Sequence, residues 1–163
     1  MKRFLFIMAV VVSMVFPATV RAEESQDSEI QLDDPVYVAK FFVAATFVAN
    51  AFDDVKKALV PEEFVEDVVD SVKVIRKNDK NKLFKKKPTG LYADTLYSES
   101  SREDKRIYIV GVLLDYGDDG AKVFYVAVIK FLEGNYCQVA KIHELDRDEI
   151  EELSRFLEER SKQ

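Results

Sequence analysis

Glycine is confined to the second part of this chain, where all five glycines lie at or after Gly90. The residues before it therefore lack the residue that most readily interrupts a helix. This segregation predicts helices first and turn-connected strands second. The first helix is expected to begin at Asp34-Pro35, a side-chain N-cap followed by a proline in the first helical position. From 36 to 49 only Lys40 and Thr46 are strongly polar, so most sides of this helix should be buried.

Two shorter helices are expected next. Asp53 and Asp54 can cap a helix over 55–59. Pro61 and two glutamates then form a first turn that suits the positive end of a helix dipole. The apolar positions that follow recur at helical spacing, at residues 64, 65, 68, 69, 72 and 75.

The second part of the chain alternates as strands do. Strands are predicted over 106–116, 121–132 and 136–143, with turns at 117–120 and 133–135 and a fourth strand near 91–98. In 106–116 both alternating sets of side chains are apolar, so both faces of the sheet should be covered. One face would wrap the buried first helix. The other would be covered by the C-terminal helix, by a partner or by another copy of the chain.

The C-terminal residues predict an amphipathic helix. Asp146-x-x-Glu149 matches a capping box, and residues 150, 153, 156 and 157 form an apolar stripe. The predicted class is α+β: N-terminal helices packed in a curved antiparallel sheet of three to four strands, with a C-terminal helix. The folded domain is predicted over 35–145 and the terminal helix over 146–163.

The N-terminus has the layout of a secretory signal peptide over residues 1–22. Lys2 and Arg3 precede an apolar run from 4 to 16, and small residues lead to a cleavage point near Ala22. A retained anchor is the alternative, but the run is shorter than the roughly 18–20 residues of a spanning helix. Residues 23–34 are acidic and predict a flexible tether. The expected location is periplasmic or secreted.

Charge and composition exclude several classes of function. The chain has 24 Lys+Arg against 30 Asp+Glu, a net charge of −6, which argues against nucleic-acid binding. One cysteine excludes an internal disulfide, and one histidine excludes a multi-histidine metal site. No metal and no cofactor is predicted.

Two stretches share the pattern of a known superfamily. Residues 39–59 form an apolar helix that reaches Asn50, then Phe52-Asp53, then a short helix. Residues 123–142 form a hairpin that turns at 133–135 and restarts at Tyr136, where the superfamily more often has tryptophan. Together they resemble the NTF2-like (cystatin-like) superfamily of small exported α+β cone domains. The resemblance implies a cone whose open end holds a small hydrophobic ligand, an active site or nothing, and whose sheet can serve for dimerisation.

His143 is the weak candidate for acid–base catalysis, with Asp94 or Asp115 as its acid. Six residues, an even number, separate Cys137 from His143 on one predicted strand, so the two side chains should share a face and lie about 20 Å apart. That separation excludes a catalytic dyad between them, and a cysteine in an apolar strand is usually a small core residue.

Residues 73–87 hold eight basic side chains against the single acid Asp79. The plain interpretation is a solvated helix end and loop. The functional interpretation is docking to an anionic surface through Lys85, Lys86 and Lys87, with Leu83-Phe84 as an apolar anchor.

Tyrosines recur on the predicted strands, and Tyr108, Tyr125 and Tyr136 are the candidates for lining a binding surface. The leading hypothesis is an exported, non-enzymatic binding or assembly module. It would bind an envelope protein or a small hydrophobic ligand through a pocket or a sheet face, with homodimerisation through the sheet as a further option. The alternative is a small hydrolase or isomerase with its active site in the cone pocket.

Overall fold

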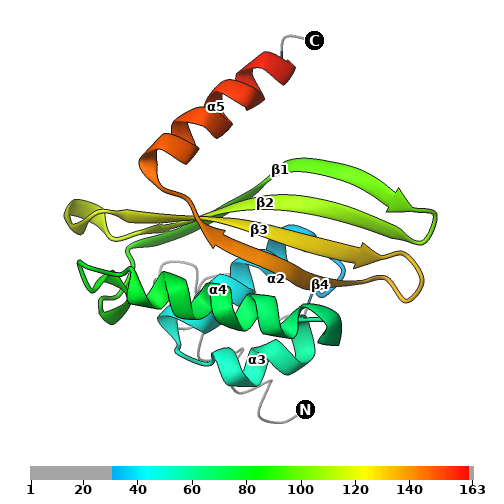
Figure 1. Cartoon of the computed structure of the whole chain (residues 1–163), viewed down its shortest axis with the longest axis horizontal. Helices are drawn as coiled ribbons and strands as arrows, with labels where there is room; N and C mark the ends of the chain where they lie inside the picture. The colour runs from blue at the N-terminus through cyan, green and yellow to red at the C-terminus, as the bar shows by residue number, and fades with distance from the viewer. Residues whose placement is uncertain (1–30, 162–163) are drawn as a thin grey trace, which may run out of the picture.

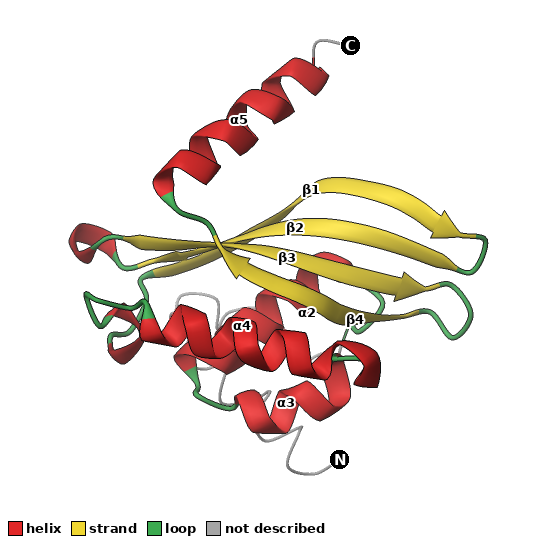
Figure 2. Cartoon of the chain, viewed as in Figure 1, coloured by secondary structure: helices red, strands yellow, loops and turns green. Residues whose placement is uncertain are grey.

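The computed structural model describes residues 31–161. The predicted signal peptide and most of the predicted tether lie outside these residues. Within them the α+β class is confirmed, because helices come first, a four-stranded antiparallel sheet follows and a C-terminal helix comes last (Figure 1, Figure 2).

The first helix forms the centre of the core. Helix α2 spans Pro35–Val43 and continues as one π-helical turn, η2, over Ala44–Val48. The Oδ1 atom of Asp34 accepts hydrogen bonds from the backbone N–H groups of Val36 and Tyr37, at 2.8 and 3.3 Å. The predicted Asp-Pro start and the nearly complete burial of this helix are therefore confirmed.

Two further helices follow it, and the first of them packs against α2. Helix α3 spans Phe52–Leu59, and the short 3₁₀ turn η3 over Glu62–Phe64 leads into α4, Val65–Lys77. Helix α4 buries Val68, Val72 and Ile75 and lies along the last strand of the sheet. These are three of the positions at which helical spacing predicted an apolar stripe.

The sheet is a meander in which each strand pairs with the next. Strands β1 (Gly90–Arg102), β2 (Lys105–Asp115), β3 (Ala121–Phe131) and β4 (Tyr136–Glu144) lie in the order β1-β2-β3-β4. The inner face packs on α2, and its buried side chains include Val110, Val112, Leu114, Phe124, Val126, Val128, Val139 and Ile142. Two 3₁₀ turns, η4 (Leu83–Lys85) and η5 (Gly117–Asp119), complete the connections.

Helices α2, α3 and α4 all lie on one side of the sheet, whereas α5, Arg147–Ser161, projects from the end of β4 on the other side (Figure 1). The predicted capping box is formed: the Asp146 N–H donates to Glu149 Oε2 at 2.8 Å, and the Glu149 N–H donates to Asp146 Oδ1 at 2.9 Å. No helix among residues 31–161 combines the length and the apolar character needed to cross a membrane.

The end of the segment predicted as a tether contacts the domain. The Cys137 N–H donates to the carbonyl oxygen of Leu32 at 2.6 Å, and Leu32 packs against the core. The Cys137 thiol lies 3.5 Å from the carbonyl oxygen of Asp33.

The expectation that Cys137 and His143 share a face is wrong. A β-bulge in β4 shifts its register against β3 between Ala127 and Val128, which adds one residue to the alternation. Cys137 is buried on the inner face, and His143 is exposed on the outer face.

Candidate functional site

The outer face of the sheet carries apolar side chains along β2 and β3, and no described helix packs across it. Alternation turns away from α2 the side chains that flank the buried ones in β2 and β3. Those that are apolar and half-buried in these two strands are Ile107, Ile109, Leu113, Val123, Ala127 and Ile129. The prediction that both strand faces are apolar is thus confirmed, while the cover that should lie over the second face is not provided by the described chain.

A groove of about 710 Å³ lies at the β4 edge of the sheet, where it is lined by α4 and by side chains of this outer face. Its floor includes Ile107, Ala127, Ile129 and Ala140, from three neighbouring strands. Charged side chains stand at its margins: Asp67 and Asp70 come from α4, whereas Lys141 and His143 come from β4. A long apolar floor between charged margins suits an amphipathic occupant.

The middle of the outer face holds a cross-strand row. Strand register aligns Asp94, Gly111, Tyr125 and His143 from β1 to β4. At Gly111 an added Cβ would lie 3.1 Å from a Leu96 methyl carbon, so the absent side chain lets Leu96 lie close over the sheet. Three strand spacings separate His143 from Asp94, about 14 Å, which excludes a direct hydrogen bond between them.

His143 contacts a different carboxylate from the two predicted. Its Nε2 atom lies 3.0 Å from Glu149 Oε1, on the first turn of α5. The backbone N–H of Asp146 and then the imidazole of His143 lower the pKa of Glu149. Asp115 instead accepts a hydrogen bond from the backbone N–H of Gly117 at 2.8 Å. Both side chains of this pair are exposed to solvent.

Cys137 is not an activated nucleophile. Burial raises the pKa of its thiol to about 12. A thiol in that environment stays protonated at neutral pH.

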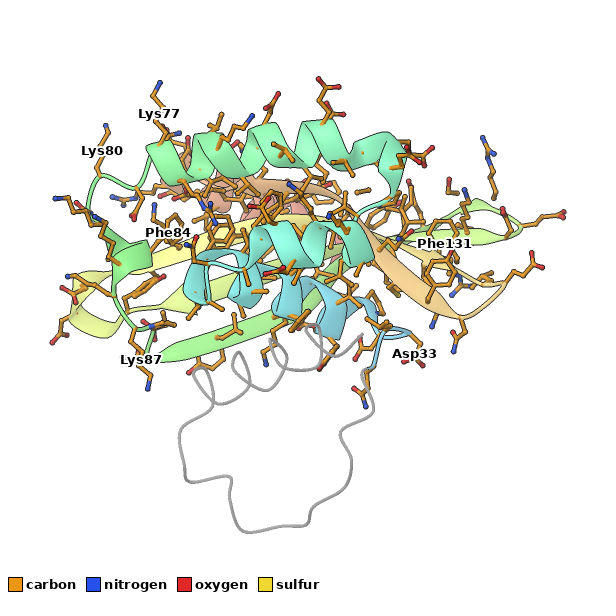
Figure 3. The ribbon with its side chains drawn as sticks, turned by 90° about the horizontal axis from the view of Figure 1, so that it is seen from below. Asp33, Lys77, Lys80, Phe84, Lys87 and Phe131 are labelled. Carbon is orange, nitrogen blue, oxygen red and sulfur yellow. The ribbon has the colours of Figure 1, made fainter. Side chains whose placement is uncertain are left out.

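The prediction that Leu83 and Phe84 form an outward-facing apolar anchor is wrong. Leu83 is buried, and the Phe84 ring stacks on Phe47 with 4.7 Å between ring centroids (Figure 3). Asp79, the single acid of the segment, accepts hydrogen bonds from the backbone N–H groups of Leu83 and Phe84, each at 3.0 Å. The segment therefore folds back into the core.

Lys122, which sequence reasoning did not single out, secures this loop to the sheet. Its Nζ atom lies 2.5 Å from Glu144 Oε1 and 3.8 Å from Asp79 Oδ1, and 5.3 Å from the centroid of the Phe84 ring. All three charged side chains are largely buried. No local pattern marked Lys122, because the network joins residues that are far apart in the sequence.

The three lysines predicted to dock are exposed. Lys86 Nζ lies 2.6 Å from Asp119 Oδ1 in the neighbouring turn η5. Lys85 and Lys87 are exposed beside it. Figure 3 places Lys77, Lys80 and Lys87 around Phe84, at the end of the molecule away from Phe131.

The three candidate tyrosines do not form one surface. Tyr125 lies on the outer face, where burial and then the charge of Glu99 raise its pKa. Tyr108 is on the inner face, packed against the core. Tyr136 lies at the far end of β4 and stacks on Phe131, with 4.7 Å between ring centroids. The floor residues of the groove, rather than the tyrosines, make the larger continuous surface.

Comparison of the chain with protein-family models, with curated proteins and with solved structures finds no match.

Proposed function

We propose that this chain is an exported, non-enzymatic binding module whose groove and outer sheet face take an apolar or amphipathic segment of an envelope protein. The observation that carries the proposal is the groove beside α4, whose apolar floor comes from β2, β3 and β4 and is covered by no helix among the described residues, with charged side chains also in its lining. Concave sites lined mainly by apolar side chains with a few polar groups are typical of binding sites. The N-terminal pattern of residues 1–22 supports export.

The chemistry of the described residues supports binding rather than catalysis. The single histidine of the chain pairs with Glu149 in solvent, and the single cysteine is buried with a raised pKa. No three His, Cys, Asp or Glu side chains within residues 31–161 are grouped so that they could hold a metal ion. A hydrolase or isomerase would need a nucleophile or a base with a tuned pKa beside the groove.

The resemblance to NTF2-like cones is part of the proposal. Its support is the position of α2, which packs against all four strands on the inner face. The groove involves the outer side of the sheet, opposite the face on which α2 packs.

The test is binding of the neutral apolar dye Nile red to the full chain, followed by its fluorescence. We expect Ile129→Asn to weaken binding about tenfold, because a buried isoleucine contact is worth roughly 1.5–3 kcal/mol. Leu132→Asn is the matched control, since Leu132 is exposed and lies outside the groove lining. Equal dye binding by the wild type and the two variants would contradict the proposal.

A further inference from the structure

The groove beside α4 adjoins a second cavity, of about 330 Å³, which lies between the end of α4 and the start of α5. The two cavities share Val74, Ile75 and His143 in their linings. We propose that the groove binds a cationic amphipathic segment of a partner protein, with its apolar side chains on the floor and its lysine or arginine side chains against α4. This inference rests on the proposed binding function and names the chemistry of the occupant of its groove.

Carboxylates outnumber basic side chains in the two linings. Among the described residues that line them, Lys141 is the only lysine and there is no arginine. The carboxylates come from Asp67, Asp70, Glu144, Asp146 and Glu149. Opposite charges across an interface select the partner and set its orientation, so this lining favours a basic occupant over an acidic one.

Asp67 and Asp70 form the acidic margin that α4 gives to the groove. They are three residues apart in the helix, so their side chains are neighbours on its surface. Both are exposed to solvent. Asp70 Oδ1 lies 3.0 Å from Lys73 Nζ, whereas Asp67 forms no ion pair with any residue of 31–161. A basic side chain of a bound segment could therefore reach Asp67 without first displacing a partner.

The second cavity adds negative charge beyond the groove. Lys122 pairs with Glu144 and lies near Asp79, so two carboxylates share one ammonium group and an excess of one negative charge remains beside the cavity. Glu149 is occupied differently, because it contacts His143 and caps α5. The predominance of carboxylates thus extends over both cavities rather than belonging to α4 alone.

The apolar floor and the acidic margin together describe an amphipathic occupant. A neutral apolar segment would use the floor and leave the margin without a partner. An acidic segment would bring like charges against Asp67 and Asp70, which is unfavourable. A segment with one apolar row and one basic row satisfies both surfaces, as in the helix-in-groove mode of peptide recognition.

The experiment measures the binding of fluorescein-labelled peptides to the full chain by fluorescence anisotropy. The first probe is a 14-residue peptide of leucine and lysine at helical spacing, about 21 Å long as a helix. Two matched probes carry glutamine or glutamate in place of every lysine. At about 0.15 M salt, which screens attraction beyond roughly 8 Å, we expect the lysine peptide to bind at least about threefold more tightly than the glutamine peptide. The glutamate peptide should bind most weakly, and Ile129→Asn should weaken binding of the lysine peptide.

The double variant Asp67→Asn, Asp70→Asn should weaken binding of the lysine peptide about threefold to tenfold, because it removes two exposed charge contacts. Its binding of the neutral dye Nile red should not change. Glu62→Gln, Glu66→Gln is the matched control, since it makes the same change in net charge at exposed positions outside both linings. The control should bind the lysine peptide as the wild type does. The reversal Asp67→Lys, Asp70→Lys should make the glutamate peptide bind more tightly than the lysine peptide.

The proposal is wrong if the wild type binds the lysine and glutamine peptides equally, or if the Asp67, Asp70 variant and its control lose the same affinity. It is also wrong if Ile129→Asn leaves binding of the lysine peptide unchanged, since the peptide would then lie outside the groove. Nile red separates these results from failure of the binding function. If Ile129→Asn weakens dye binding while the peptides show no charge preference, the groove binds apolar ligands and only the basic character of its partner is wrong.

Discussion

Thr46 shows how the core accommodates a polar group inside an apolar helix. Its side chain is fully buried in the π-turn η2, and Oγ1 has no hydrogen-bond partner among the described residues. Its backbone carbonyl oxygen is satisfied, because Arg76 Nη2 donates to it at 2.9 Å and also to Asn50 Oδ1 at 3.0 Å. The hydroxyl thus adds a desolvation cost without a compensating bond.

Thr46→Val should therefore raise the free energy of unfolding by about 1 kcal/mol, since the replacement keeps the shape and removes the unsatisfied hydroxyl. Urea unfolding followed by circular dichroism measures the change. Val43→Thr, at another fully buried position of the same helical segment, should lower the free energy by a similar amount. A destabilised Thr46→Val variant would show that the hydroxyl is satisfied.

At the scale of elements, the loop between α4 and β1 is held by a buried charge network rather than by secondary structure. Asp79 satisfies two backbone N–H groups of η4 and lies beside Lys122, which Glu144 also contacts. Local sequence pattern identified the basic residues of this loop. It did not identify Asp79 as the buried acid that holds the loop in place, because the partners of Asp79 are set by tertiary packing.

Asp79→Ala is expected to lower the free energy of unfolding by about 3 kcal/mol. The variant leaves the backbone N–H groups of Leu83 and Phe84 without an acceptor, and it leaves Lys122 with one carboxylate partner. Asp70→Ala is the matched control: Asp70 forms an ion pair with Lys73 on the surface of α4, at 3.0 Å. Exposed pairs contribute little, so the control should change by less than about 0.5 kcal/mol. Thermal or urea unfolding of both variants measures these changes in the free energy of unfolding.

At the scale of the whole molecule, cations gather at one end of a chain that is acidic overall. We expect this end to bind vesicles that contain anionic lipid, as each lysine near such a surface contributes about 1 kcal/mol. The double variant Lys85→Glu, Lys87→Glu should weaken binding at least about tenfold in a vesicle sedimentation assay. Lys86 is left in place because it pairs with Asp119.

The control for this assay is Lys57→Glu, Arg102→Glu, which makes the same change in net charge at exposed sites elsewhere. Equal loss of binding in both double variants would show a dependence on net charge rather than on this end of the molecule. Absence of binding by the wild type would reject the docking role.

Much of the fold was predictable because its signals are local. The Asp34-Pro35 start, the capping box at Asp146 and the turns between strands each occupy a few neighbouring residues. The strand register could not be predicted in the same way: the β-bulge in β4 follows from pairing with β3, and it places His143 on the opposite face from Cys137, which is buried as expected. The groove is formed by residues of three strands and a helix. The sequence shows that its floor residues are apolar, but it does not show that they form one surface.

The order of the elements also has a consequence for synthesis. Helix α2 emerges among the first described segments, yet its burial requires all four strands, the last of which ends at Glu144. Until then one of the most apolar parts of the chain has no sheet to cover it. The meander itself assembles from adjacent hairpins and closes quickly once made. The interval before closure is when this chain is most exposed to aggregation and most dependent on chaperones.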